Sequence, residues 1–212
     1  MQCVDDNALS VFIPLDAIGA ISTCRDTARE SIFITVAGHG LWFKSKETAR
    51  AMHGALLKAA KIPLVDVDDG TWRVSFPVED IDYIRTFITD DQKAYGVEFS
   101  VYLLVFTFAA QARSVHDTLL KAAKIVLLDV EDDYGTRLSA PIDDIEPLHH
   151  PVLWGSRFCL YVGPYPLYFE TEVGARKVFD DLQLSAAMGG MVLNLNTTKC
   201  SGSSISTVSP FQ

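Results

Sequence analysis

The sequence lacks the marks of a secreted, membrane-bound or nucleic-acid-binding protein. Its longest apolar run, 101–108, is interrupted by Thr107 and is too short to span a bilayer. No basic segment followed by an apolar stretch opens the chain, so we expect a soluble, cytoplasmic protein. Only 18 Lys and Arg oppose 27 Asp and Glu, and the net charge of −9 argues against direct binding to nucleic-acid phosphates or to an anionic membrane.

Catalytic and metal-binding patterns are also missing. The four cysteines, Cys3, Cys24, Cys159 and Cys200, include no CxxC pair, which argues against a zinc knuckle and favours a reducing compartment. The sequence contains no Gly-x-Ser-x-Gly elbow, no P-loop, no dinucleotide fingerprint and no HExxH motif. We therefore expect no enzymatic activity, no cofactor and no metal site.

The sequence does contain an internal repeat, present in three copies. Leu56 recurs as Leu119, 63 positions later, and Leu182 stands a further 63 positions along the chain. A fixed period of this length indicates supersecondary units that bury their apolar faces against one another. The expected domains are repeat 1 at 1–61, repeat 2 at 62–124, repeat 3 at 125–188 and a Ser/Thr/Asn-rich tail at 189–212.

Each repeat combines β-prone stretches with a closing helix. Strand-like stretches with a proline and then an acidic residue before isoleucine lie at 12–18, 76–81 and 140–145. Closing helices are expected at 46–61, 109–124 and 172–187. Apolar stripes on these helices are Ala49, Met52, Leu56 and Ala59, then Ala112, Val115, Leu119 and Ala122, then Ala175, Val178, Leu182 and Ala186.

The predicted fold class is therefore α+β, with three tandem repeats of about 63 residues, each of three to four antiparallel strands and a C-terminal helix. A pseudo-threefold arrangement is favoured over an open stack, because the outer helices are as apolar on their inner stripe as the middle one. The order of elements resembles small strand–strand–strand–helix modules, including the C-terminal half of PH-like domains. That likeness is one of pattern and implies no function.

Two groups of polar residues invite a chemical interpretation. The carboxylate runs 66–70 and 129–133 are too short for a calcium loop, so we expect solvated acidic hairpins. His53 and His116 occupy one repeat position, which the third repeat fills with Phe179. A position that accepts either ring predicts packing rather than proton transfer.

The hairpin tips carry the most informative surface residues. Val101, Tyr102 and Leu103 place large apolar side chains where turns are usually polar, Tyr165 stands between prolines, and Trp42 follows its own tip by two residues. Such exposed residues commonly mark contact surfaces. The alternative, that the tips fold over a neighbouring repeat, stays open.

The functional hypothesis is a non-catalytic acidic protein that engages a partner protein with a neutral or basic surface, as an inhibitor, adaptor or assembly factor. The first alternative is a binder of small anionic ligands that uses the recurring Arg50, Arg113 and Arg176 in clefts between repeats. The second alternative is a nucleic-acid mimic whose acidic turns occupy a basic cleft on a DNA- or RNA-handling protein.

Overall fold

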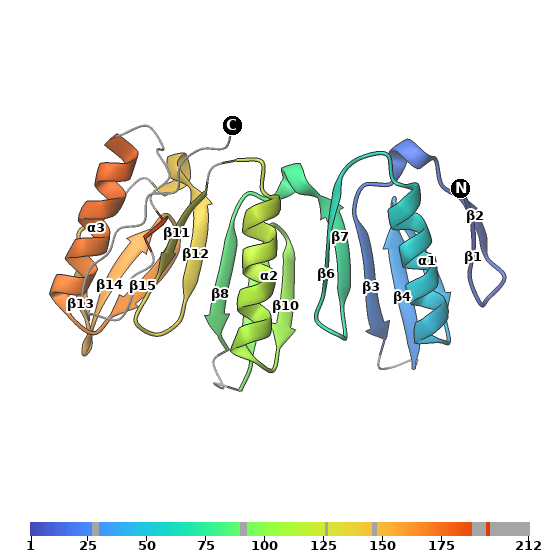
Figure 1. Ribbon diagram of the computed structural model, residues 1–212. Coiled ribbons are helices and arrows are strands. Elements are labelled where there is room, and N and C mark those ends of the chain that lie inside the picture. Colours follow the sequence, from blue (N-terminus) through green and yellow to red (C-terminus); the bar gives the residue numbers. More distant parts are fainter. Residues whose placement is uncertain (27–29, 90–92, 126, 146–147, 188–193, 196–212) are drawn as a thin grey trace. The chain divides into compact units, whose positions relative to one another are not determined.

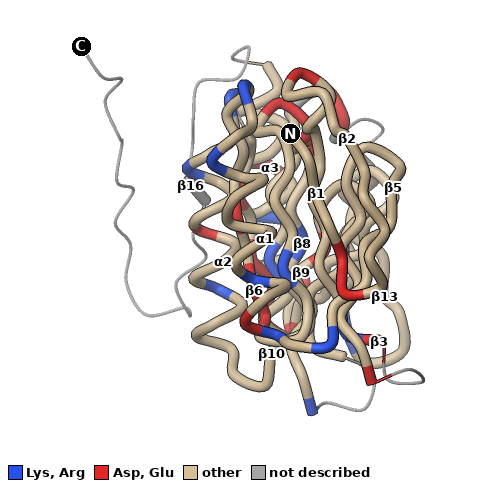
Figure 2. The backbone as a smooth tube through the Cα atoms, turned by 90° about the vertical axis from the view of Figure 1, so that its right-hand side faces the viewer, with Lys and Arg blue, Asp and Glu red and all other residues tan. Residues whose placement is uncertain are grey.

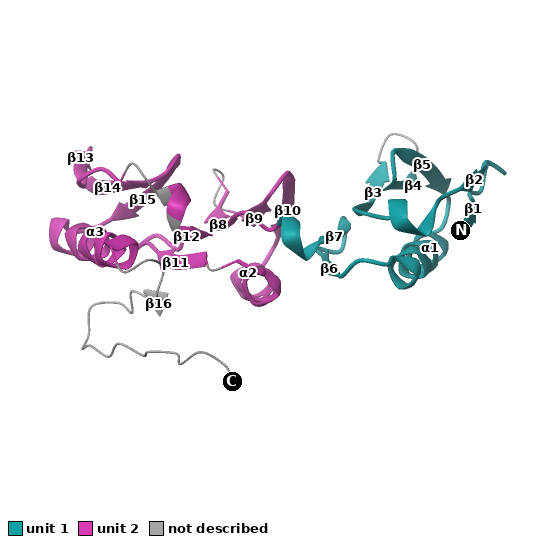
Figure 3. Cartoon of the chain, turned by 90° about the horizontal axis from the view of Figure 1, so that it is seen from above, with its two compact units in different colours: residues 1–80 teal, residues 81–212 magenta. Residues whose placement is uncertain are grey.

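The fold is a mixture of antiparallel sheets and three α-helices, seen in a computed structural model (Figure 1). The structure describes residues 1–26, 30–89, 93–125, 127–145, 148–187 and 194–195. The chain divides into two compact units, residues 1–80 and residues 81–212 (Figure 3). No helix within the described ranges is long and apolar enough to cross a bilayer.

Unit 1 contains a five-stranded antiparallel sheet of order β5-β4-β3-β7-β6 and a separate hairpin of β1 and β2. Its elements are β1 (Gln2–Val4), β2 (Ser10–Phe12), the 3-10 turn η1 (Leu15–Ala17), β3 (Ile21–Asp26), β4 (Ser31–Val36), β5 (His39–Phe43), α1 (Lys46–Ala59), β6 (Leu64–Asp68), β7 (Arg73–Pro77) and η2 (Val78–Asp80). Helix α1 packs on the meander of β3, β4 and β5 and leaves the opposite face of those strands without a helix (Figure 3).

Helix α1 forms where the sequence predicts it, and its boundaries have local causes. The Ser45 side chain accepts a hydrogen bond from the Thr48 backbone N–H, which caps the first turn. Ala49 and Leu56 of the predicted stripe are fully buried, whereas Met52 is only half-buried. The third fully buried residue of α1 is His53, which the predicted stripe did not include.

Unit 2 contains a six-stranded sheet of order β10-β9-β8-β12-β11-β16 and a three-stranded sheet of order β13-β14-β15. Its elements are β8 (Ile84–Ile88), β9 (Tyr95–Phe99), β10 (Tyr102–Phe106), α2 (Ala109–Ala122), β11 (Leu127–Glu131), β12 (Arg137–Pro141), η3 (Ile142–Ile145), β13 (Val152–Trp154), β14 (Arg157–Val162), β15 (Tyr165–Phe169), α3 (Glu172–Ala187) and β16 (Asn194–Leu195). Helix α2 packs on β8, β9 and β10, and α3 packs on β14 and β15.

Each unit has its own apolar core, formed where a helix meets a sheet. The buried cluster of unit 1 consists of Cys3, Ile13, Ile18, Ile21, Ile34, Val36, Leu41, Phe43, Ala49 and Leu56. A buried cluster of unit 2 consists of Leu128, Val130, Leu138, Ala140, Leu160, Val162, Leu167, Phe169, Ala175, Val178, Phe179 and Leu182. Ala49 and Leu56 of the first predicted stripe and Ala175, Val178 and Leu182 of the third belong to these clusters, whereas Met52, Ala59 and Ala186 are only half-buried.

The local structure differs from the expectation in two places. The proline segments read as strand-like contain the 3-10 turns η1, η2 and η3, because proline starts a tight turn as readily as it ends a strand. Strands β3, β8 and β13, which follow these turns, were not predicted, so in the described residues each predicted repeat has five strands before its helix rather than three to four. Of the predicted tail, 189–212, only β16 is among the described residues, and it pairs in parallel with β11.

Candidate functional site

A buried histidine joins the helix of unit 1 to two strands. The Nδ1 atom of His53 lies 2.6 Å from the hydroxyl oxygen of Thr23 on β3, and its Nε2 atom lies 2.7 Å from that of Ser75 on β7. Ser75 donates in turn to Asp66 on β6 at 2.7 Å, and Arg73 pairs with the same carboxylate at 2.8 Å. His53 has no exposed surface, so both ring nitrogens find their partners inside the protein.

Unit 2 contains the same arrangement with other residues. The Nδ1 and Nε2 atoms of His116 each lie 2.8 Å from a hydroxyl oxygen, on Thr86 of β8 and Ser139 of β12 respectively. Ser139 donates to Asp129 at 2.8 Å, and Arg137 forms two hydrogen bonds to that carboxylate. We call each set of five residues a histidine network.

The hydrogen bonds place a proton on one nitrogen of the histidine. Because Ser139 donates its proton to Asp129, its oxygen accepts from His116 Nε2, and in the neutral ring Nδ1 accepts from Thr86. Burial lowers the pKa of His116, which favours the same neutral ring, although the nearby Asp129 acts in the opposite direction. Burial alone would raise the pKa of Asp129, but hydrogen bonds from Arg137 and Ser139, together with His116 Nε2 at 3.6 Å, outweigh it and hold that pKa well below its usual value.

The network contains serine, histidine and aspartate but not the geometry of a hydrolytic triad. In a triad the serine hydroxyl donates to histidine and the carboxylate binds the far ring nitrogen. Here the serine donates to the carboxylate, so His116 cannot remove the proton of Ser139. What the arrangement does is connect a helix to two strands by charge-assisted hydrogen bonds in a buried place. Sequence analysis predicted a packing role for this position and missed its hydrogen bonds.

Carboxylates in the acidic turns hold neighbouring strands in place. Asp5 accepts backbone hydrogen bonds from its own turn and, at 3.1 Å, from the backbone N–H of Trp42 on β5. Asp132 accepts from its own turn and, at 2.9 Å, from the backbone N–H of Tyr168 on β15. The prediction of solvated acidic hairpins is wrong for Asp129 and Asp132, because each is only 5% exposed. Both side chains accept hydrogen bonds from groups of the fold. Burial raises the pKa of Asp132, although the backbone N–H groups that donate to it act in the opposite direction.

The β9–β10 hairpin carries an exposed apolar strip. Val101 in the turn is 86% exposed, and Leu103 and Val105 on β10 are 48% and 46% exposed. Because side chains alternate along a strand, Leu103 and Val105 share one face of β10, while the intervening residue points into the core beneath α2. Tyr102 is half-buried, with its ring 5.6 Å from that of Phe99. We call Val101, Leu103 and Val105 the β10 strip.

Tyr165, which was predicted as a contact residue at a hairpin tip, packs against β8. Its ring lies 5.2 Å from that of Tyr83, and the Arg85 guanidinium lies 5.6 Å from its centre. The Tyr83 hydroxyl donates to the backbone oxygen of Ser100 in the β9–β10 turn at 3.0 Å. The tip of the β14–β15 hairpin therefore folds over the preceding meander, as the alternative interpretation of the tips expected.

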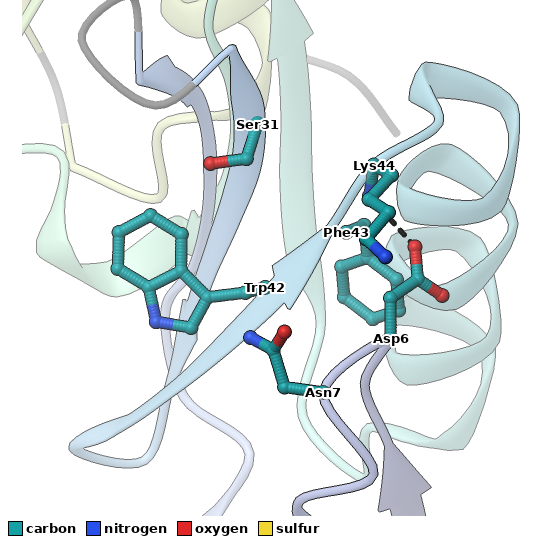
Figure 4. A pocket seen from close by; sticks show the side chains of 6 residues that line it. All are labelled: Asp6, Asn7, Ser31, Trp42, Phe43 and Lys44. Carbon is teal, nitrogen blue, oxygen red and sulfur yellow. Dashed lines mark hydrogen bonds between the residues drawn. The ribbon is translucent and has the colours of Figure 1, made fainter.

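Trp42 lies in unit 1 beside a hollow of about 310 Å³ (Figure 4). The hollow is lined by Asp6, Asn7, Ser31, Trp42, Phe43 and Lys44. Trp42 packs on Phe33 with the ring centres 4.4 Å apart. The hydroxyl oxygen of Ser31 is buried and has no hydrogen-bond partner within the described part of the chain. Trp42 is therefore a half-buried wall of a polar hollow rather than a residue of an open tip.

A second hollow in unit 1, of about 290 Å³, is rich in cations. It is lined by Arg25, Glu30, Ile32, Lys44, Lys46, Gly70 and Thr71. Lys44 lines both hollows, and Lys46 donates to the backbone oxygen of Gly70 at 2.8 Å. The concentration of Arg25, Lys44 and Lys46 is notable because the whole chain carries a charge of −9.

The three recurring arginines that were proposed for an anionic ligand each contact a carboxylate. The pairs are Arg50 with Asp68, Arg113 with Glu131 and Arg176 with Glu172. The arginine side chains keep 44%, 47% and 68% of their surface exposed. A ligand at any of these positions would compete with an existing ion pair.

The histidine networks could have been found in the sequence. Thr23, His53 and Asp66 recur 63 positions later as Thr86, His116 and Asp129, and Arg73 and Ser75 recur 64 positions later as Arg137 and Ser139. The signal was missed because the one-residue insertion in the third acidic turn shifts the last two residues out of the common period.

Comparison with protein families, with curated proteins and with solved structures gives no match for this chain.

Proposed function

We propose that this chain is a non-catalytic binding protein that engages a partner protein through the β10 strip. The observation that supports this most is the exposure of Val101 in the β9–β10 turn together with Leu103 and Val105 on one face of β10. A contiguous exposed apolar strip is unfavourable for a free protein and is typical of a surface that a partner covers.

The position of the strip in the sheet supports the same proposal. Strand β10 is an edge strand, and in the described residues it pairs only with β9. Proteins usually protect such edges with lysine, proline or a bulge, and β10 contains neither lysine nor proline. A partner strand could therefore add to this edge by main-chain hydrogen bonds.

The chemistry around the strip indicates the kind of partner. Leu103 stands opposite Glu98 in the β9–β10 register, and Glu98 pairs with Arg85 at 3.6 Å, so both signs of charge border the apolar surface. The net charge of −9 is what favours an apolar surface with neutral or basic surroundings on the partner. A cytoplasmic site of action is part of the proposal, since Cys3, Cys24 and Cys159 are free thiols.

The proposal is tested by recovery of partners from the native host with wild type and two variants. Leu103→Ser with Val105→Thr removes the apolar surface of the β10 strip. Val173→Ser is the matched control, because Val173 is 78% exposed on α3 and outside the strip. We expect the strip variant to lose a partner that the wild type and the control both retain, with melting temperatures unchanged. Equal recovery by all three proteins would refute the proposal.

In this proposal the triplicated repeat is the scaffold that carries the β10 strip. In unit 1, β7 of the second sequence repeat pairs with β3 of the first, and in unit 2, β12 of the third repeat pairs with β8 of the second. Each repeat thus adds its opening hairpin to the sheet of the repeat before it.

Binding of a small anionic ligand is a second candidate function. It is favoured by the hollow lined with Arg25, Lys44 and Lys46, rather than by the three ion-paired arginines. The test is thermal stabilisation by inorganic phosphate, compared with chloride at equal ionic strength, for wild type and Lys44→Ser. Specific binding predicts stabilisation of the wild type only, and equal effects of the two salts would exclude it.

The nucleic-acid mimic is the third hypothesis and has less support. Asp5 and Asp132 accept hydrogen bonds from backbone groups of the fold, so these turn carboxylates are not presented to a partner. Acidic and basic residues are each spread over several elements, so neither sign is confined to one of them (Figure 2). Salt-sensitive binding to a basic partner remains its distinguishing property.

A further inference from the structure

The acidic turn before β2 and the acidic turn before β12 hold a neighbouring strand in the same way. In unit 1, the Asp6 backbone N–H donates to the Trp42 oxygen on β5 at 2.9 Å, and the Lys44 backbone N–H donates to the Asp6 carboxylate at 2.7 Å. In unit 2, the Asp133 backbone N–H donates to Tyr168 on β15 at 3.2 Å, and the Asp133 carboxylate accepts from the residue two positions after Tyr168 at 2.9 Å. The two turns and strands are therefore equivalent frames.

The hollow of about 310 Å³ in unit 1 lies on this frame, so each residue that lines it has a counterpart in unit 2. Strands β4 and β14 begin 126 positions apart, at Ser31 and Arg157, and β5 and β15 begin with the same offset. The hydrogen bonds of the two turns match with an offset of 127 positions. In order, the lining residues Asp6, Asn7, Ser31, Trp42, Phe43 and Lys44 correspond to Asp133, Tyr134, Arg157, Tyr168, Phe169 and Glu170.

Unit 2 occupies this place with two of its own side chains. The guanidinium carbon of Arg157 lies 4.0 Å from the centre of the Tyr134 ring, a cation–π contact between the strand and the turn. In unit 1 the counterparts are Ser31 and Asn7, which are shorter and uncharged. The hollow of unit 1 therefore lies where unit 2 has a stacked planar pair.

Two polar groups at the hollow have no partner among the residues that the structure describes. The Ser31 hydroxyl oxygen is buried without a hydrogen bond, which is unfavourable for a polar group, and it points to the side on which the Trp42 ring lies (Figure 4). The Lys44 ammonium has no ion pair or side-chain hydrogen bond. Its counterpart in unit 2 is Glu170, so unit 1 lacks the arginine and carries the opposite charge beside its place. The charge of the hollow therefore favours an anion rather than a second cation.

We propose that this hollow binds a small planar organic anion, an aromatic carboxylate in the simplest case. The ring of the ligand packs along the Trp42 indole, and its carboxylate accepts hydrogen bonds from the Ser31 hydroxyl and the Lys44 ammonium. A volume of about 310 Å³ is at the lower end for small-molecule sites, which suits a ligand of one or two rings. The site is distinct from the cationic hollow at Arg25 and does not depend on the β10 strip.

The aromatic wall of the site is held in place without a ligand. Trp42 stands opposite Phe33 in the β4–β5 register, with the ring centres 4.4 Å apart. The Phe33 ring in turn lies directly over Gly40, where any Cβ would collide with it. Because the two rings are fixed by the sheet, the ligand does not have to order the Trp42 side chain when it binds.

The test uses benzoate as the probe and two matched compounds as controls. Benzamidine is a planar cation of nearly the same shape, and cyclohexanecarboxylate is an anion without a planar ring. Binding is followed at constant ionic strength through the ¹H–¹⁵N signal of the Trp42 indole, which is assigned by its loss in Trp42→Phe. Ligands of this size bind with a Kd on the order of 1 mM, so the titrations extend to about 20 mM.

Three variants locate the binding. Ser31→Arg with Asn7→Tyr installs in unit 1 the pair that the equivalent frame of unit 2 already accommodates, and circular dichroism verifies that it folds. Lys44→Gln leaves the hollow open and removes only the charge, so the proposal stays testable if the filled variant does not fold. Arg25→Ser is the control, because Arg25 lines the cationic hollow and not this one.

We expect benzoate to shift the Trp42 signal saturably in the wild type and in Arg25→Ser, to bind about tenfold more weakly to Lys44→Gln, and not to bind the filled variant. An unchanged Trp42 signal, or equal shifts in the wild type and Lys44→Gln, would overturn the proposal. Tighter binding of benzamidine than of benzoate would also overturn it, because the hollow would then accept a cation in the place of the missing arginine. Stabilisation by phosphate without any effect of benzoate would refute this site and leave the cationic hollow as the anion site.

Discussion

The Nε2 atom of His116 lies 2.8 Å from the hydroxyl oxygen of Ser139, and this contact joins helix α2 to a strand of the following hairpin. The direction of the bond follows from the next one, since Ser139 gives its own proton to Asp129. Nε2 of His116 therefore carries a proton, and burial, which lowers the pKa of His116, favours the neutral ring in which Nδ1 accepts. The fold thus specifies a tautomer as well as a position.

The first prediction is that both buried histidines show this tautomer in solution. Long-range ¹H–¹⁵N correlation spectra at neutral pH should give a protonated Nε2 and an acceptor Nδ1 for His53 and for His116. His39 and His149, which are exposed, serve as internal controls and should show averaged tautomers. A protonated Nδ1 at either buried ring would show that the serine donates to histidine instead.

The second prediction compares the two carboxylates of the networks. Asp129→Ala leaves Ser139 without its acceptor and removes one of the two carboxylates that Arg137 contacts, at a site where the aspartate is 5% exposed, and should destabilise by about 3–5 kcal/mol. Asp66→Ala removes the same contacts where the side chain is 30% exposed, so water replaces part of the loss and we expect about 1–2 kcal/mol. Urea unfolding measures both losses. Equal losses would mean that burial does not set the strength of the network.

The sequence predicted the helices and their buried stripes well, because periodic alanine and leucine positions depend on local spacing alone. Ala49, Leu56 and Leu119 were all placed in the core correctly. The histidine networks could not be read from one helix, because the partners of His53 come from strands 22 and 30 residues away. Tertiary pairing of β7 with β3 decides which side chains face the ring, and no local pattern encodes that pairing.

The predicted contact residues lie in different surroundings for a related reason. An apolar tip can be exposed or can fold over a neighbour, and composition alone does not distinguish the two. Leu103 stays exposed, whereas Tyr165 finds Tyr83 and Arg85 beneath it. Tyr165 is covered because the preceding meander places Tyr83 and Arg85 beside its ring, and this placement is a property of the fold.

The third prediction concerns the leucine that recurs in each helix. Leu56, Leu119 and Leu182 are all fully buried, so Leu→Ala at each should destabilise by about 2–5 kcal/mol through lost apolar burial and the cavity that remains. Denaturant midpoints of the three variants provide the measurement. A loss below about 1 kcal/mol at all three positions would contradict the placement of this stripe in the core.

The fourth prediction uses a close approach between a glycine and an aromatic ring. A Cβ added at Gly96 would lie 2.5 Å from the ring of Phe87 on the neighbouring strand, so Gly96→Ala should destabilise by about 1–3 kcal/mol. Gly96→Ala combined with Phe87→Ala should lose less than the sum of the two single changes, because the collision is gone. Gly54→Ala is the control: it has open space on α1 and should stabilise by about 0.5–1 kcal/mol. Additive losses at 87 and 96 would show that the ring can move aside freely.

The last prediction is the response of stability to acid. Burial lowers the pKa of His116 below its usual value of about 6.5, so the folded state favours the neutral ring and this contribution is complete above about pH 6.5. As the pH falls below that value, this histidine binds a proton in the unfolded chain before it does so in the folded chain. The free energy of unfolding therefore decreases until the pH reaches the pKa of the folded state. Hydrogen bonds hold the pKa of Asp129 below its usual value against the effect of burial, so its contribution is present above about pH 4 and is lost only below it. The wild type should therefore lose stability in two stages.

A variant at one residue separates these stages. His116→Phe places at this position the ring that the third repeat already has there, so we expect it to fold with reduced stability at neutral pH. Because phenylalanine does not titrate, the free energy of unfolding of the variant should fall less than that of the wild type between about pH 7 and pH 5, and the two curves should converge there. The later loss below about pH 4 should remain, since Asp129 keeps Ser139 and Arg137 as partners. Parallel curves from pH 7 to pH 5 would mean that His116 titrates alike in both states, and the neutral buried ring would then be the wrong description of the network.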